Sequence, residues 1–462
     1  MSVVGAIMVP HPPIILPEVG RGEEKKIAAT DEAYRKAAAF VGSLRPETIV
    51  LLSPHSVMYA DYFHISPGKS AKGNMRQFRA PQVEINASYD SAFVRKLTDA
   101  ASSAGFPAGT LGERNPELDH GTMIPLYYIN QCCTDYQLVR IGLSGLPLPD
   151  HYRLGQLILQ TADSLDRRTV IIGSGDLSHK LREDGPYGLS KEGPEYDERI
   201  MDVMGRAAFD ELLDFDEVFC DKAAECGHRS FCIMAGALDG LSVETQKLSH
   251  EGTFGVGYGV CTYRVTGKDA SGYCLKIWKE RQRKTLEEKY RKEDAYVRLA
   301  RASVSSWVTE GKKAELTEDL PEEMLQNRAG VFVSLHKDGR LRGCIGTIQA
   351  VRKNIAEEIV ENAISAATRD PRFAPVRPDE LETLEISVDV LGEPEKIRSK
   401  DELDVKRYGV IVTKGFRRGL LLPNLDGVES VDEQLSIALR KAGLSEREKN
   451  FEMERFEVIR HV

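Results

Sequence analysis

The feature that most constrains the fold is a series of short apolar runs that alternate with amphipathic stretches over residues 1–265. The sequence of a strand is a continuous apolar run when both faces of its sheet are covered, because neither face then contacts water. The alternation predicts an α/β domain, with a sheet flanked by helices. The expected strands are Val3–Val9, Thr48–Ser53, Gln137–Gly142, Val170–Gly173 and Phe254–Val265, and the expected helices are Glu24–Leu44, Asp90–Ala104, His151–Leu165, Glu195–Leu213 and Cys226–Leu241.

The pattern changes after residue 265. Residues 266–294 are rich in charge and poor in apolar side chains, which is typical of a solvated linker or an exposed helix face. Residues 295–462 mix hairpin signals with helical periodicity, which predicts a separate α+β domain. The expected helices there are Ala295–Val308, Asn354–Ala367 and Val431–Ala442, and the expected strands are Val331–Leu335, Leu341–Ile348, Leu384–Leu391, Tyr408–Thr413, Gly419–Leu422 and Phe451–His461, with a turn at Asp338-Gly339.

Charge and cysteine usage exclude several classes of protein. The formal net charge is −9, which argues against non-specific binding to nucleic acid or to an anionic membrane. No run approaches the roughly 18 apolar residues of a membrane-spanning helix. The eight cysteines form no C-x-x-C pair, so a zinc ribbon is not expected. We therefore expect a cytoplasmic protein with reduced cysteines.

Histidines stand at the ends of three expected strands. His11 follows Val3–Val9, His55 follows Thr48–Ser53, and His179 follows the strand at residues 170–173. In open α/β sheets, ligands bind in the crevice outside the carboxyl ends of the strands. The three histidines are therefore candidates to converge, and His120 lies in a loop before an apolar helix. The alternative for each is a turn residue that is bonded to nearby backbone.

A third metal ligand is offered by two adjacent residues, Glu225 and Cys226. Two imidazoles and one carboxylate form the set that non-haem Fe(II) prefers, with positions left open for substrate and oxygen. A thiolate instead favours zinc or copper. Glu225 also suits the first turn of a helix, where the helix dipole favours an acid. The residues alone leave these alternatives open.

Six motifs in order give the first 265 residues a resemblance to the class III extradiol dioxygenase family of the LigB-like type, and especially to its Memo-like branch. The motifs are Pro-His-Pro-Pro at 10–13, Ser-Pro-His-Ser at 53–56, Leu-Asp-His-Gly at 118–121, Gly-Ser-Gly-Asp-Leu-Ser-His at 173–179, Glu-Cys-Gly-His at 225–228 and Phe-Gly-Val-Gly-Tyr-Gly at 254–259. The resemblance implies a mixed sheet flanked by helices. It also implies ring cleavage of a small aromatic diol with O2.

The same resemblance implies roles for individual residues. His11, His55 and Glu225 would be Fe(II) ligands, His179 the acid/base and His120 a substrate-binding residue. Memo-like members carry cysteine as the third ligand, which keeps Cys226 as the alternative and zinc or copper as alternative metals. Two rival functions follow: a metal-binding or regulatory partner protein without dioxygenase activity, and a zinc hydrolase that uses His179 as base.

Residues 295–462 resemble the AMMECR1 domain. The hallmark is Leu-Arg-Gly-Cys-Ile-Gly at 341–346, and Ala-Thr-Arg-Asp-Pro-Arg-Phe at 367–373 supports it. This family has no secure activity to transfer. Its association with Memo-like proteins implies a radical-SAM protein as a partner, and a homo-oligomer is left open. Cys344, Arg342 and Arg369 are the candidate site residues, and their alternatives are a half-buried strand cysteine and loop hydrogen bonding.

Overall fold

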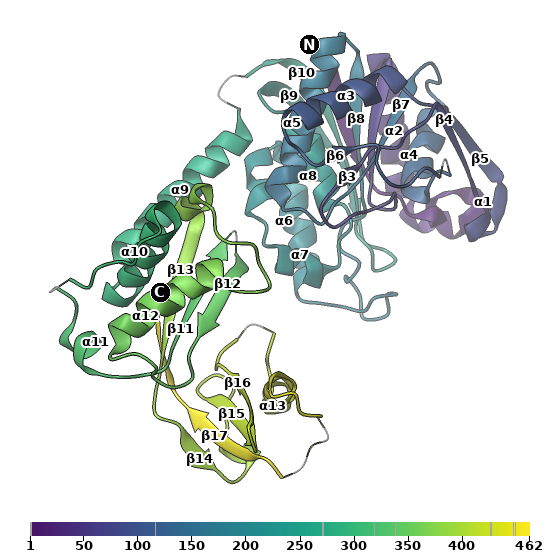
Figure 1. Ribbon diagram of the computed structural model, residues 1–462. Coiled ribbons are helices and arrows are strands. Elements are labelled where there is room, and N and C mark those ends of the chain that lie inside the picture. Colours follow the sequence, from purple (N-terminus) through teal and green to yellow (C-terminus); the bar gives the residue numbers. More distant parts are fainter. Residues whose placement is uncertain are drawn as a thin grey trace. The chain divides into compact units, whose positions relative to one another are not determined.

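The computed structural model describes residues 2–115, 117–269, 272–317, 319–337, 339–425, 427–446, 448 and 450–462. The chain divides into a first unit that ends at Glu280 and a second that begins at Arg281. Figure 1 shows the first unit in purple to teal and the second in green to yellow.

One six-stranded sheet forms the centre of the first unit. In order across the sheet, its strands are β7 (Gln137–Gly142), β2 (Thr48–Ser53), β8 (Thr169–Ser174), β1 (Val3–Val9), β10 (Tyr258–Lys268) and β9 (Leu241–Glu251). The first four run parallel, whereas β10 is antiparallel to both β1 and β9. The expected mixed sheet is therefore confirmed.

Helices cover both faces of this sheet (Figure 1). The helices of the first unit are α1 (Pro17–Gly20), α2 (Ala28–Leu44), α3 (Ser91–Ser103), α4 (His120–Ile129), α5 (Leu148–Leu165), α6 (Glu192–Arg206), α7 (Glu217–Ala223) and α8 (His228–Gly236). Strand β2 shows why its sequence is apolar throughout. Ile49 and Leu51 pack with α2 and α4 on one face, and Val50 and Leu52 pack with α5 and α8 on the other.

The structure adds strands that carry no apolar run. The helix expected at Cys226–Leu241 is shorter, and β9 follows it as a partly exposed edge strand of mixed polarity. Four short strands are further additions: β3 (Phe63–His64), β4 (Ser70–Met75), β5 (Ala80–Ser88) and β6 (Ala108–Gly109). The β4–β5 hairpin exposes most of its alternate side chains, so its sequence lacks the signal of a buried strand.

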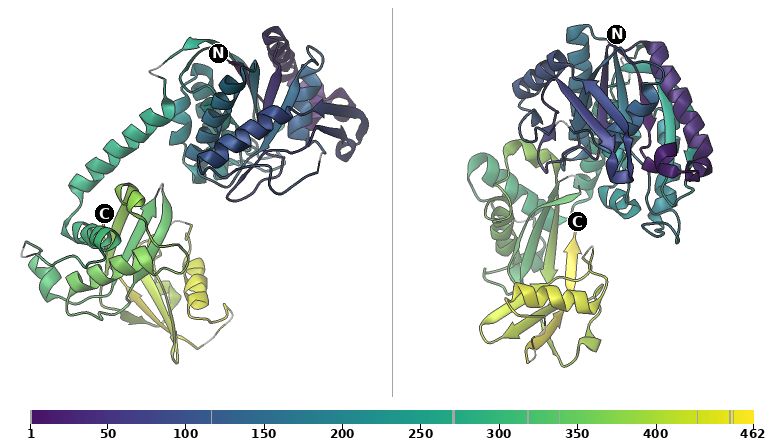
Figure 2. Two further views of the ribbon diagram at one scale, coloured as in Figure 1. Left: turned by 45° about the horizontal axis from the view of Figure 1, so that its top comes forward. Right: turned by 90° about the vertical axis from the view of Figure 1, so that its right-hand side faces the viewer.

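The second unit contains two four-stranded sheets, which confirms the expected α+β class. The first has β12 (Arg340–Gly346), β11 (Val331–Lys337), β13 (Leu384–Leu391) and β18 (Val458–His461), and the second has β14 (Glu395–Ile397), β17 (Glu452–Phe456), β15 (Gly409–Lys414) and β16 (Arg417–Leu421). Its helices are α10 (Ala295–Glu310), α11 (Glu322–Gln326), α12 (Ile355–Thr368) and α13 (Val431–Lys441). Figure 2 shows α13 against the second sheet, where it contacts β15 and β16.

One expected strand near the end of the chain needs correction. Phe451–His461 is not one strand, because β17 and β18 pair in different sheets. Residues 266–294 hold the end of β10 and the helix α9 (Cys274–Lys292). Leu275 and Trp278 near the start of α9 pack on the core of the first unit. The expected turn residue Asp338 lies outside the described residues.

Among the described residues, no helix combines the length and the apolar character that crossing a membrane requires.

Candidate metal centre

Three neighbouring parallel strands bring the candidate site residues to one edge of the sheet. Strands β2, β8 and β1 are adjacent in that order, so their carboxyl ends lie side by side. His11 follows β1, His55 follows β2, and the segment from Ser174 to His179 follows β8. Cys226 approaches the same edge from the loop before α8.

The ligand atoms of His11, His55 and Cys226 all lie within 4.8 Å of one another. The two Nε2 atoms of His11 and His55 are 3.0 Å apart, and Sγ of Cys226 is 3.6 Å from Nε2 of His11. Metal–nitrogen bonds of about 2.1 Å and metal–sulfur bonds of about 2.3 Å, at bond angles of roughly 90–110°, place two ligand atoms roughly 3.0–3.6 Å apart. These three side chains therefore fit one metal ion.

The hydrogen bonds of His11 present its Nε2 to this group. Nδ1 of His11 lies 2.9 Å from Oγ of Ser174, and that hydroxyl donates to the carbonyl of Gly121 at 2.6 Å. Because the hydroxyl has a single hydrogen, it accepts from Nδ1–H of His11. The lone pair of the neutral ring is then on Nε2, and a hydrogen bond of this kind orients a metal-binding histidine. The backbone N–H of His11 donates to the carboxylate of Asp176 at 2.7 Å.

Burial keeps His11, His55 and His120 neutral. Desolvation lowers the pKa of His11 well below its usual value and also lowers that of His55. For His120, burial and then the charges of His55 and His11 lower the pKa to about 3. Burial raises the pKa of the Cys226 thiol, with Asp176 and Glu225 adding to the shift. Neutral imidazoles are ready to bind a cation, whereas the thiol needs one nearby to ionise.

His120 and His179 also lie at this edge. The ring of His120 is 4.0 Å from that of His55 and 5.4 Å from that of His11, measured between centroids. The carboxylate of Asp119 accepts the backbone N–H of Thr122 and so caps the start of α4. This cap fixes the position of His120, the first residue of the helix. The buried Nδ1 of His179 has no hydrogen-bond partner among the described residues. Such a buried polar atom is a candidate to exchange a proton with a bound molecule.

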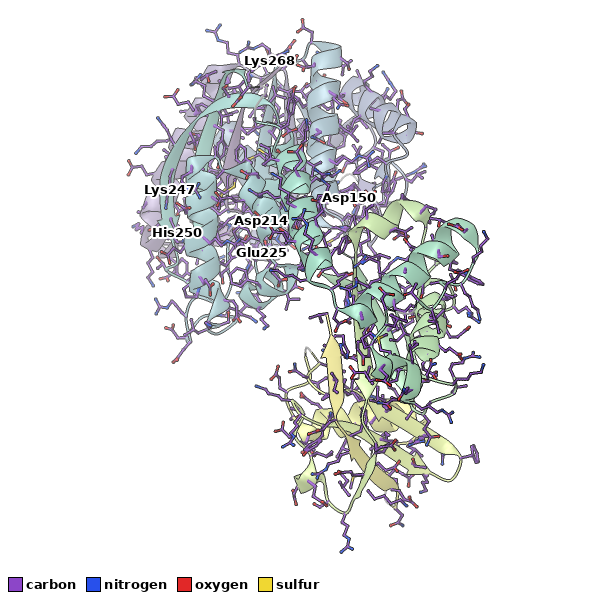
Figure 3. The ribbon with its side chains drawn as sticks, turned by 90° about the vertical axis from the view of Figure 1, so that its left-hand side faces the viewer. Asp150, Asp214, Glu225, Lys247, His250 and Lys268 are labelled. Carbon is purple, nitrogen blue, oxygen red and sulfur yellow. The ribbon has the colours of Figure 1, made fainter. Side chains whose placement is uncertain are left out.

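Glu225, which is labelled in Figure 3, is not one of the three residues of this group. Its carboxylate accepts the backbone N–H of His228 at 2.6 Å, at the start of α8. Burial raises the pKa of this carboxyl to about 7. Glu225 lies just before α8, and its carboxylate binds the backbone N–H of the first helical residue. Between the two adjacent candidates, the structure therefore brings Cys226, and not Glu225, to the histidines.

Comparison with protein families matches residues 5–261 to the catalytic LigB subunit of aromatic ring-opening dioxygenase. The chain belongs to the LigB family. Residues 297–461 of this LigB-family protein match the AMMECR1 family. The two matches reproduce the fused architecture that the motifs predicted.

Relatives of this LigB-family protein include one that matches over the whole chain. The protein CA_C1420 of Clostridium acetobutylicum is 42% identical over 469 residues, which cover all of this chain and 99% of the relative. A protein of Thermotoga maritima is 53% identical over 170 residues, 37% of this chain and 98% of its own. Among solved structures, PH0010 of Pyrococcus horikoshii is 33% identical, with a TM-score of 0.34, and covers 36% of this chain and 88% of its own.

The AMMECR1 domain of the LigB-family protein separates its three candidate residues. Arg342 pairs with Glu380 at 3.0 Å, and Cys344 accepts a hydrogen bond from Ser334 at 3.2 Å. Arg369 directly follows α12, where its backbone N–H donates to the carbonyl of Ser365. No contact between Arg369 and Cys344 is found among the described residues. Asp370 and Arg372 contact Cys344 instead, as is shown by the N–H of Cys344 donating to Asp370 at 2.9 Å and by Arg372 donating to the carbonyl of Cys344 at 3.3 Å.

Sequence reasoning did not assign roles to Ser174 and Asp176 beside the metal group. Both stand in the motif at residues 173–179, so a signal was present. Their function is visible only when β8 lies beside β1, since each bonds to a residue more than 160 positions away in the chain.

Proposed function

We propose that the LigB domain is a metal-dependent enzyme that opens the ring of a small aromatic diol with O2. The observation that carries the proposal is the convergence of His11, His55 and Cys226 at the carboxyl edge of the sheet. The match to the LigB family supports the reaction class. His120 and His179, which flank the three ligand candidates, supply groups that hold a substrate and move its protons.

A bound metal ion would supply charge and a template that brings a diol and oxygen together. The chain's own residues supply the rest. His120 is neutral because its pKa is held at about 3, so one of its ring nitrogens carries a hydrogen that can bond to a substrate oxygen. His179 would take a hydroxyl proton on its unpartnered Nδ1 and return it later.

The thiol of Cys226 supports a second candidate function. A thiolate in place of a carboxylate favours zinc or copper over the Fe(II) that a ring-opening dioxygenase requires. With zinc, the same residues would support a hydrolase in which His179 acts as base toward water. The third alternative is a metal-binding partner protein that does not turn over a substrate.

Anaerobic purification followed by metal analysis and oxygen uptake with a catechol panel separates these functions. His11→Ala, His55→Ala and Cys226→Ala should each lose most of the bound metal. Oxygen uptake by the iron-loaded wild type, with a ring-opened product, supports the proposal. Zinc as the bound metal, with ester hydrolysis and no oxygen uptake, supports the hydrolase. Metal without either activity supports the partner protein, and full metal occupancy in all three variants would contradict the ligand assignment.

A further inference from the structure

A polar cavity opens beside His55 and His120. Its volume is about 580 Å³, and its wall includes Asn74, Arg76 and Glu117. A second cavity of about 460 Å³ shares these three residues and extends to Lys72 and Glu84. The two cavities therefore form one groove that leads away from the imidazoles of the metal group along the β4–β5 hairpin.

The composition of the wall is unusual for a site that binds a bare aromatic ring. Small-molecule sites are mostly apolar or aromatic, with a few polar groups. Among the described residues that line the cavity nearest His55, only Leu118 is aliphatic. Asn74 and Asn115 line both cavities with side-chain amides. Their amide oxygens accept the backbone N–H groups of Arg76 and Glu117. A ring without polar substituents would leave the amide NH2 groups without partners as it displaced their water.

One charge on the wall is already satisfied. The carboxylate of Asp119 accepts hydrogen bonds from Ser53 at 2.5 Å and from Thr122 at 2.9 Å. Arg140 lies 3.8 Å from the same carboxylate. Asp119 is thus occupied by the protein and is not free to bind a cationic substrate.

Arg76 is in the opposite situation. Arg76 is an exposed residue that lines the groove, and its guanidinium has no ion pair or hydrogen bond among the described residues. Arg76 begins the short 3-10 turn Arg76–Phe78, and the ring of Phe78 packs edge-on against His120 at 5.2 Å between centroids. This contact holds the turn beside His120, so Arg76 presents an unpaired cation to the groove close to the metal group.

We propose that the substrate extends from the metal group along this groove and carries an anionic group, a carboxylate or a phosphate, that Arg76 binds. The end of the substrate at the metal rests on the proposed function, whereas the anionic group rests on the groove alone. A guanidinium matches the oxygen pairs of both anions through parallel N–H bonds. Glu117 on the same wall repels a second negative charge, so a single anionic group is favoured.

Binding of matched probes to the zinc-loaded protein tests this inference, since zinc does not react with oxygen. The probes are 3,4-dihydroxyphenylacetate, 3,4-dihydroxybenzylphosphonate and the neutral 4-methylcatechol, measured by titration calorimetry. Wild type should bind the better of the two acids at least tenfold more tightly than 4-methylcatechol. The acid that binds more tightly identifies carboxylate or phosphate as the group recognised.

Variants of nearby charges supply the controls. Arg76→Gln should weaken binding of the acids roughly tenfold, the usual value of a hydrogen bond to a charged group, and leave 4-methylcatechol unchanged. Arg79→Gln removes the same charge three residues away, from a residue that lines neither cavity, and should change nothing. Glu117→Gln should strengthen binding of the acids a few-fold. Equal effects of Arg76→Gln and Arg79→Gln, or equal affinity for acidic and neutral probes, would overturn the inference.

Phenylacetate and benzylphosphonate, which lack the diol, separate this inference from the proposed function. Loss of their binding in Arg76→Gln but not in Arg79→Gln supports the anionic subsite even if no catechol is turned over. Turnover of catechols with no difference between the two variants supports the proposed function and contradicts the subsite.

Discussion

Gly175 and Gly227 lie in contact through their backbones: a methyl group on Gly175 would be 2.1 Å from Cα of Gly227. Gly175 follows Ser174, the hydrogen-bond partner of His11, and Gly227 follows Cys226. Beside this contact, the N–H of Asp176 donates to Sγ of Cys226 at 3.3 Å, and the N–H of Cys226 donates to the carbonyl of Asp176 at 3.3 Å. The two glycines thus let the loop after β8 hold Cys226 against the histidines.

Substitution of Gly175 by Ala should therefore weaken metal binding. The added methyl group meets backbone that has no flexible side chain to move, which costs roughly 1–3 kcal/mol of stability and displaces Cys226. Gly205→Ala in α6 is the matched control, because its nearest neighbour would be 3.5 Å away and helical alanine is favoured over glycine. Metal titration and thermal unfolding of both variants check this. Unchanged metal affinity in Gly175→Ala would contradict the role of the contact.

Removal of the Glu225 carboxylate should affect stability more than metal content. Glu225→Ala leaves the N–H of His228 without its partner at the start of α8, at a cost of about 1–2 kcal/mol. Metal analysis and urea unfolding are the measurements. Glu225→Gln, which keeps an acceptor oxygen, should recover part of the loss. If Glu225→Gln lost the metal while Cys226→Ala kept it, the third ligand would be the carboxylate.

His179→Ala should keep the metal and slow the reaction. A positioned acid/base contributes roughly 10²–10⁴-fold to rate, and His179 is not among the three atoms that fit one ion. Tyr187→Phe is the control, since it preserves the ring that lies 5.2 Å from the ring of His179 and should leave the rate unchanged. Single-turnover rates and metal content are measured together. Loss of metal in His179→Ala would make this residue a ligand.

The pair Arg342–Glu380 should stabilise the second unit in a pH-dependent way. The hydrogen bond from Arg342 lowers the pKa of Glu380 from 4.5 to about 2, and both side chains are largely buried. A lowered carboxyl pKa gives stability that is complete above about pH 4.5 and is lost as the pH falls toward about 2. Glu380→Gln should therefore cost about 2–3 kcal/mol at pH 7, and the cost should shrink below pH 4.

Urea unfolding followed by Trp307 fluorescence, in a Trp278→Phe background, reports on the second unit. The control is Asp379→Asn, which breaks the exposed pair with Arg377 and should change stability by less than about 0.5 kcal/mol. A cost for Glu380→Gln that stayed the same at pH 3 would show that the effect is not electrostatic.

The sequence by itself determined where the histidines of the site would be found. The buried parallel strands before His11 and His55 are continuous apolar runs that can be recognised locally. Because parallel strands end at the same edge of a sheet, residues that follow them are expected to lie at that edge. The two-domain order was also readable, because the AMMECR1-like motifs and the hairpin signals begin only after the charged stretch at residues 266–294.

Only the tertiary structure decided which of Glu225 and Cys226 faces the histidines. Adjacent side chains point in different directions, and the loop that carries both residues packs at Gly227 against Gly175, more than 50 residues away in the chain. The β4–β5 hairpin that carries Arg76, and the edge strand β9, were likewise beyond the sequence. Their side chains are largely exposed, so backbone pairing within a hairpin, β4 with β5 and β9 with β10, and not a local apolar period, makes them strands.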